Sequence, residues 1–218
     1  MLKNAIELEP DYVLSQAELG HRLRLIAAYD HIDMDGYKKA EQQMLKALSI
    51  DQNSLSTLKI LVYLYTDMDQ PIKALEMAQR MLAINPDNPT TYYPLTRLYF
   101  YTGMNELAIK AIEKAYNLDP KNYYNNNLGI TYFNAGHYQK GVDFINSFDK
   151  DKNNGPAQLW LGMNYQRLGQ NKKALDTFRN LKTIKTNSEL SKQAALINIA
   201  ILEDIYERPR QVKSLFMI

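Results

Sequence analysis

Apolar residues recur along most of the chain with the spacing of amphipathic helices. They stand at i, i+3, i+4 and i+7, which makes one face of a helix apolar and leaves the opposite face polar. Between residues 92 and 115 this pattern occurs twice, with a glycine-containing break between the two stretches. The pattern predicts an all-α chain built from pairs of short helices.

The helix pairs repeat with a period of 33 or 34 residues. Three position classes keep this period: a small residue inside each second helix, a bulky residue near the end of each first helix, and Asp or Gly at the turn between them. They are, in that order, Ala40, Ala74, Ala108, Gly141 and Ala174; His31, Tyr65, Tyr99, Tyr132 and Tyr165; and Asp35, Asp69, Gly103, Gly136 and Gly169. Because independent classes share one period, the chain is predicted to be an array of stacked units.

Turn residues and prolines mark where the helices should begin and end. Gly103 suits the positive φ of a helix C-cap. Asp69 followed by Pro71 predicts the start of a second helix, since proline is tolerated in the first turn. Pro86 and Pro120 are expected to end second helices. Within a first helix, Pro94 predicts either a late start, after residues 90–91, or a kink.

The expected organisation is five units flanked by two different ends. The units cover residues 21–54, 55–88, 89–121, 122–154 and 155–188. Residues 1–20 are interpreted as a partial repeat with N-terminal helices, because Met1–Pro10 has the pattern of the end of a second helix. Residues 189–218 are interpreted as capping helices or a truncated sixth repeat, with a helix over Leu190–Tyr206 and a short one opened by Pro209. The apolar ending LFMI suggests a segment of a longer protein, or a partner at this end.

The unit resembles the tetratricopeptide repeat, whose pattern is W-x2-L-G-x2-Y, then A-x3-F, then P. The fifth unit contains Leu161, Gly162 and Tyr165, followed by Ala174 and Phe178. The resemblance covers about residues 21–188. It implies a right-handed superhelical solenoid of antiparallel helix pairs that binds a protein or peptide partner without catalysis.

Composition and charge narrow the function classes. Lys and Arg total 26 against 24 Asp and Glu, so nothing marks a nucleic-acid binder. The longest uncharged apolar run, ILVYLY at residues 60–65, is far too short to span a membrane. The absence of cysteine removes thiolate chemistry and disulfides. The compartment stays open: the cytoplasm is the default, and an extracytoplasmic location would follow from a longer precursor.

Candidate chemistry is sparse. His21, His31 and His137 have no metal-type spacing, and His31 occupies a packing position that holds Tyr in the other units. The segments DHIDMDG (residues 30–36) and DKDKNNG (residues 149–155) lack carboxylates that a calcium loop needs. Phosphate-binding, dinucleotide-binding and nucleophile-elbow motifs are missing. We expect no catalytic residues, no metal and no cofactor.

In a solenoid of helix pairs the first helices line the concave face. Placing the residues by repeat phase predicts a groove rich in Tyr, Phe, Trp, Arg and Asn, which are suited to hold a partner segment. The predicted ligand-binding residues are Lys59, Tyr63, Tyr93, Arg97, Phe100, Tyr101, Asn126, Asn127, Ile130, Phe133, Trp160, Met163 and Arg167. The alternative is that individual rings among them fill space between neighbouring first helices.

Members of the tetratricopeptide-repeat family that clamp a chaperone's C-terminal carboxylate need Lys, Asn, Asn, Lys and Arg in five positions. Those positions hold Lys59, Tyr63, Pro94, Tyr123 and Asn127, and only Lys59 fits, so this clamp is not expected. The leading hypothesis is an adaptor or assembly factor. The alternatives are a scaffold that forms homo-oligomers through its ends, and the regulatory region of a larger enzyme.

Overall fold

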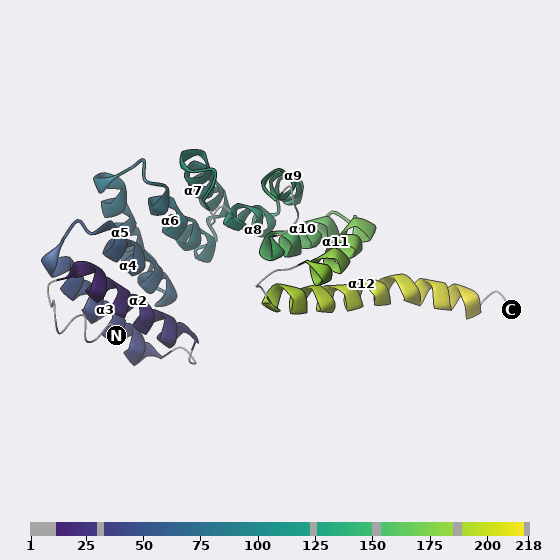
Figure 1. Cartoon of the computed structure of the whole chain (residues 1–218), viewed down its shortest axis with the longest axis horizontal. Coiled ribbons are helices and arrows are strands. Elements are labelled where there is room, and N and C mark those ends of the chain that lie inside the picture. Colours follow the sequence, from purple (N-terminus) through teal and green to yellow (C-terminus); the bar gives the residue numbers. More distant parts are fainter. Residues whose placement is uncertain (1–11, 30–32, 123–125, 150–153, 185–188, 216–218) are drawn as a thin grey trace. The chain divides into compact units, whose positions relative to one another are not determined.

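A computed structural model of the chain describes residues 12–29, 33–122, 126–149, 154–184 and 189–215 (Figure 1). For Tyr29, Asn126 and residues 205–215 it describes the backbone alone. These residues form eleven helices, α2 to α12, and no strand, which confirms the predicted all-α fold. The chain divides into two compact units, residues 1–122 and 123–218. The interpretations of Met1–Pro10, of His31 and of the LFMI ending fall wholly or partly outside the described residues.

Unit 1 contains three helix pairs. In each pair the first helix packs against the second, and first helices of successive pairs also contact each other. Buried residues from all three pairs form one apolar core, in which Met44, Leu58, Leu61 and Met81 are fully buried. The pairs are α2 (Val13–Tyr29) with α3 (Met34–Ile50), α4 (Leu55–Asp67) with α5 (Pro71–Ile84), and α6 (Pro89–Tyr101) with α7 (Asn105–Leu118).

Four of the turns within pairs share one geometry. Gly103, Gly136 and Gly169 have φ of 75°, 79° and 71°, and Asp69 has φ of 55°. The residue after each turn residue donates its N–H to the carbonyl five residues earlier, as Gln70 does to Tyr65 at 2.8 Å. This is the hydrogen bond of a Schellman motif, which satisfies carbonyls at the end of the first helix.

The predicted turn class was wrong at one of its members, Asp35. Asp69 lies in the turn, as predicted, between the C-cap Met68 of α4 and the N-cap Gln70 of α5, which begins at Pro71. Asp35 lies inside α3, where the side chain of Asp33 caps the helix by accepting from the Asp35 N–H at 3.0 Å. Two carboxylates in one short stretch compete for the cap, and repeat phase alone does not rank them.

The late start predicted for the helix with Pro94 is also wrong. α6 begins at Pro89, with the Asn88 side chain accepting from the Thr90 N–H, and it runs through Pro94 to Tyr101. Pro94 removes only the N–H that would bond the carbonyl of Thr90. The helix keeps its packing because Leu95 and Leu98, which follow the proline, are buried in the core of unit 1.

Unit 2 contains two pairs and a long final helix. They are α8 (Asn126–Asn134) with α9 (Tyr138–Phe148), α10 (Gly155–Arg167) with α11 (Asn171–Thr183), and α12 (Glu189–Leu215). Phe178 is fully buried where α11 meets Gly162 of α10, and a Cβ added at Gly162 would lie 2.3 Å from its ring. The small residue of the repeat pattern therefore makes room for the ring of the A-x3-F pattern.

α12 takes the place of a further first helix. Asn164 Nδ2 of α10 donates to the Trp160 carbonyl, and Asn198 Nδ2 of α12, 34 residues later, donates to the Ala194 carbonyl. Ala195, Ile199 and Leu202 join the apolar cluster around α11. The helix is continuous from Glu189 to Leu215, so the prediction of a separate helix opened by Pro209 is wrong.

Candidate functional site

The predicted ligand-binding residues fall into two sets, one in each unit. Unit 1 contains Lys59, Tyr63, Tyr93, Arg97, Phe100 and Tyr101. Unit 2 contains Asn126, Asn127, Ile130, Phe133, Trp160, Met163 and Arg167.

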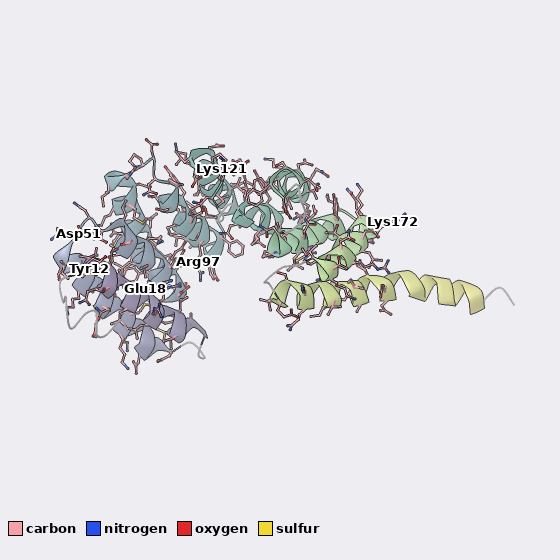
Figure 2. All side chains as sticks on the ribbon, viewed as in Figure 1. Tyr12, Glu18, Asp51, Arg97, Lys121 and Lys172 are labelled. Carbon is pink, nitrogen blue, oxygen red and sulfur yellow. The ribbon has the colours of Figure 1, made fainter. Side chains whose placement is uncertain are left out.

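A shared carboxylate joins three successive first helices of unit 1. Asp67 of α4 is only 7% exposed at its side chain, and each of its oxygens accepts from a different guanidinium. Arg24 Nη1 of α2 lies 2.5 Å from Oδ2, and Arg97 Nη2 of α6 lies 2.6 Å from Oδ1. Arg97 projects from α6 and is 37% exposed at its side chain (Figure 2).

Aromatic rings hold the same guanidinium groups from a second direction. The Cζ atoms of Arg24 and Arg97 lie 5.5 Å and 5.7 Å from the centroid of the Tyr63 ring. Arg97 Cζ also lies 5.1 Å from the ring of Tyr101, which is 62% exposed and meets Phe100 edge-on. We name Tyr63, Arg97, Phe100 and Tyr101 the first-helix surface of unit 1. It combines exposed rings with a guanidinium fixed in place.

Two pKa shifts report the electrostatic environment beside this surface. Burial lowers the pKa of His21, and the positive charges of Arg24 and Lys59 lower it further against the opposing effect of Glu18. Burial raises the pKa of Tyr37, and the negative charge of Asp67 adds to that shift. His21 is therefore held in its neutral form at neutral pH, and it contributes no positive charge here.

The structure places Tyr93 differently from its prediction. Its side chain is 6% exposed, so it is buried and not presented to a partner. Tyr92, beside it, is half-buried, packs against the apolar core of unit 1 and donates its hydroxyl to the Pro86 carbonyl at 2.6 Å. A first helix in such an array packs both on its own partner and on neighbouring pairs, so two of its faces are apolar. Tyr93 is therefore consistent with the alternative interpretation, in which individual rings fill space between neighbouring first helices.

Unit 2 has an aromatic cluster formed by Phe133, Tyr138 and Trp160. The Phe133 ring of α8 lies 5.2 Å from that of Trp160 on α10 and 5.6 Å from that of Tyr138 on α9. Arg167 Cζ lies 5.7 Å from the Phe133 centroid. All three rings are half-buried, and Arg167 is exposed. Tyr138 was not predicted because it is the first residue of a second helix, and the candidate residues were taken from first helices only.

The other predicted residues have mixed surroundings. Asn127 is exposed and Ile130 is half-buried, whereas the side chain of Asn126 lies outside the description. Met163 packs against the apolar cluster around Phe178, so it belongs to the core of unit 2. In unit 1, Lys59 is half-buried.

Arg24 and Asp67 were missed by sequence reasoning. The repeat gave a weak signal for Asp67. Arg97 lies one 34-residue period after Tyr63, and Tyr101 lies one period after Asp67, so Asp67 occupies the same repeat position as Tyr101, which was predicted. Arg24 matches no such phase, and its partner is 43 residues away. Only the packed helices bring the two charges together.

An apolar cavity of about 230 Å³ lies elsewhere in unit 1, where the start of α5 meets the end of α6. Ile72, Leu75, Tyr99 and Met104 are among its lining residues. Across the described ranges, no three His, Cys, Asp or Glu side chains come together as a metal site would require. None of the helices within those ranges has the length and apolarity to cross a membrane.

Two stretches of the chain match the sequence pattern of the tetratricopeptide repeat. One is residues 90–122, which span α6 and α7, and the other is residues 156–184, which span α10 and α11. The chain contains tetratricopeptide repeats. Repeats of this fold generally form non-enzymatic modules for protein interaction, which bind protein partners. No curated protein matches the sequence of this chain.

Solved structures support the same fold, an all-α helical-repeat solenoid. The thermophilic TPR protein TTC0263 of Thermus thermophilus has 15% identity and a TM-score of 0.61, covering 83% of this chain and 99% of that one. A putative kinesin light chain of Podospora anserina with nearly identical TPR-like repeats has 17% identity and a TM-score of 0.62, with coverages of 81% and 95%. YrrB, a TPR protein described as having an unusual peptide-binding site, has 17% identity and a TM-score of 0.54, with coverages of 89% and 97%.

Proposed function

We propose that this protein is a non-catalytic adaptor or assembly factor that binds a peptide or protein segment on the first helices of its units. The observation that carries the proposal is the first-helix surface of unit 1. There, Tyr101 is 62% exposed and Phe100 39% exposed beside a guanidinium that is already held by Asp67.

The residue types and their fixed positions both support binding. Tyr, Trp and Arg contribute most often to interface hot spots, at about 2 kcal/mol or more when central and desolvated. Arg97 is anchored by a carboxylate and two rings, so it loses little side-chain entropy when a partner binds. The aromatic cluster of unit 2 offers a second set of half-buried rings. The peptide-binding site named for YrrB, a protein of similar fold, agrees with this proposal.

A variant of the first-helix surface should lose peptide binding while it keeps its fold. Peptides selected from a random library on the full chain provide the probe. Replacing Phe100 and Tyr101 together with alanine should weaken such peptides by about 30-fold or more, because two exposed rings are removed. Calorimetry measures the affinity, and far-UV circular dichroism checks the helices.

A matched control comes from exposed apolar residues on second helices. Replacing Leu107 and Ile84, which are 42% and 38% exposed, with alanine removes similar surface from α7 and α5. The control should bind as tightly as the wild type. If both double variants bind the peptides equally well, the first-helix surface is not the binding site.

A second candidate function is self-association, favoured by an exposed apolar stripe on α12. Leu190, Ile197 and Ile201 are 78%, 62% and 47% exposed, and their spacing of seven and four residues puts them on one helix face. Ser191, Ala195 and Leu202 on the opposite face are buried. The occupant we propose for the stripe is α12 of a second copy, because two identical stripes can pair antiparallel around a twofold axis.

Self-association through α12 should appear as a concentration-dependent mass. With only three large side chains per copy, the dissociation constant should be on the order of 100 μM. Replacing Ile197 with aspartate should leave a monomer at all concentrations in sedimentation equilibrium, whereas Leu107→Asp in unit 1 should behave as the wild type. A wild type that stays monomeric at several times that concentration would remove this candidate.

A further inference from the structure

The first-helix surface of unit 1 carries more positive charge than its shared carboxylate can balance. Arg24 and Arg97 share Asp67, and Lys59 adds a third cation close enough to lower the pKa of His21. Glu18 is engaged by Arg22, at 2.8 Å. The face formed by α2, α4 and α6 therefore holds an excess of cations, although the whole chain carries a formal charge of only +2.

Asp67 supplies one negative charge to two guanidinium groups, so it cannot balance both of them. Both oxygens already accept a short hydrogen bond, and the side chain is 7% exposed. In addition, the Nε atoms of Arg24 and Arg97 are buried and have no acceptor. Two guanidinium groups with one carboxylate between them keep a net positive charge, which a further anion beside the exposed part of Arg97 would balance.

The arrangement also fixes the accessible guanidinium in one geometry. Arg97 is bonded to Asp67 on one side and lies against the rings of Tyr63 and Tyr101. Arg24 is almost wholly buried, with its side chain 7% exposed, and adds a second positive charge to the site. The exposed part of a guanidinium held in this way is already positioned to pair with a carboxylate.

We propose that this site binds a carboxylate of the partner, so that the partner segment is acidic where it meets Arg97 and aromatic or apolar where it meets Phe100 and Tyr101. The residues are Arg24, Asp67 and Arg97, outside the positions of the chaperone-tail clamp. The carboxylate can come from an Asp or Glu side chain or from a chain terminus. The inference rests on the proposed function, because it specifies the partner of the same surface.

Three short peptides distinguish a side-chain carboxylate from the carboxylate of a chain terminus. The first is acetyl-Gly-Glu-Phe-Glu-Phe-Gly-amide, the second replaces both Glu with Gln, and the third is the Gln peptide with a free C-terminal carboxylate. Titration of the full chain, labelled with ¹⁵N and followed by the arginine Nε–H signals, measures affinity and location together. The Glu peptide should bind about tenfold more tightly than the capped Gln peptide and should shift the Arg97 signal. The free-carboxylate peptide reports whether a terminus serves equally well.

Two variants of the site should change the affinity for the Glu peptide in opposite directions. Arg97→Gln should reduce the affinity for the Glu peptide to that for the Gln peptide. Asp67→Asn should raise it several-fold, because the site then loses the anion that the two arginines share. A purely structural role for the three residues predicts no rise. Arg179→Gln, which removes an exposed arginine paired with Glu203 at 2.7 Å in unit 2, should change nothing.

The outcomes distinguish this inference from the function it rests on. Equal binding of the Glu and Gln peptides, or an Arg97→Gln variant that keeps the difference, overturns the acidic partner. Binding of a phosphoserine peptide without binding of the Glu peptide overturns it as well. The proposed function survives these results if peptides bind and the Phe100/Tyr101 variant loses them. Should Asp67→Asn fail to fold, the wild type decides: its affinity for the Glu peptide must fall as salt rises, and that for the capped Gln peptide must not.

Discussion

Replacing Phe178 with alanine is expected to lower the free energy of unfolding of unit 2 by about 3–5 kcal/mol. The ring is fully buried and is held against Gly162, where no Cβ could fit beside it. Because α10, α11 and α12 all contribute to the surrounding cluster, the cavity opens between these three helices. Neighbouring side chains cannot collapse into it without moving a helix.

The chain contains a single tryptophan, Trp160, which lies in unit 2 and reports its unfolding. Urea titration followed by its fluorescence should show the transition of Phe178→Ala at a clearly lower midpoint. Leu196→Ala, which shortens a side chain that is 47% exposed on α12, should change the free energy by less than about 1 kcal/mol. Equal shifts for the two variants would mean that the Phe178 contact does not hold the unit together.

Replacing Asp67 with alanine is expected to destabilise unit 1 by about 3–5 kcal/mol. The substitution leaves two guanidinium groups beside each other without their shared carboxylate, and Arg24 is 7% exposed at its side chain. An uncompensated charge in a buried position is costly because water no longer solvates it. Replacing Arg24 with methionine in the same variant should recover part of the loss, since one of the unpaired charges is then gone.

Urea unfolding followed by far-UV circular dichroism measures this loss, and Trp160 fluorescence separates it from changes in unit 2. Asp87→Ala is the matched control: that carboxylate is 78% exposed and 3.6 Å from Lys114, so its loss should cost about 0–1 kcal/mol. An Asp67→Ala variant as stable as the Asp87→Ala control would show that the shared carboxylate has no structural role.

The fold was largely predictable because its determinants are local. Periodic apolar positions predict the helices, and the glycines at 103, 136 and 169 predict turns that need positive φ. The pairing of a small residue with a large one, as at Gly162 and Phe178, follows from the repeat pattern itself. These signals lie within one period of about 34 residues, so a single sequence contains them.

The candidate site was less predictable because its contacts join different helix pairs. Whether Tyr92 or Tyr93 is buried depends on which neighbour each helix face meets, and both faces look apolar in sequence. Arg24 meets Asp67 across 43 residues, and no spacing rule relates them. Met163 was assigned to the groove by phase, yet it packs against the cluster of α11 and α12.

The shared carboxylate of Asp67 has a consequence for how such an array can be shortened or rebuilt. Removing residues 55–88 would keep the backbone period, because it deletes one whole pair, and α2 would then stack directly on α6. Arg24 and Arg97 would meet without the carboxylate that joins them in unit 1. The helix pairs of unit 1 are therefore not interchangeable modules. Neighbouring pairs are matched by charge, so the order of the pairs is part of what the sequence specifies.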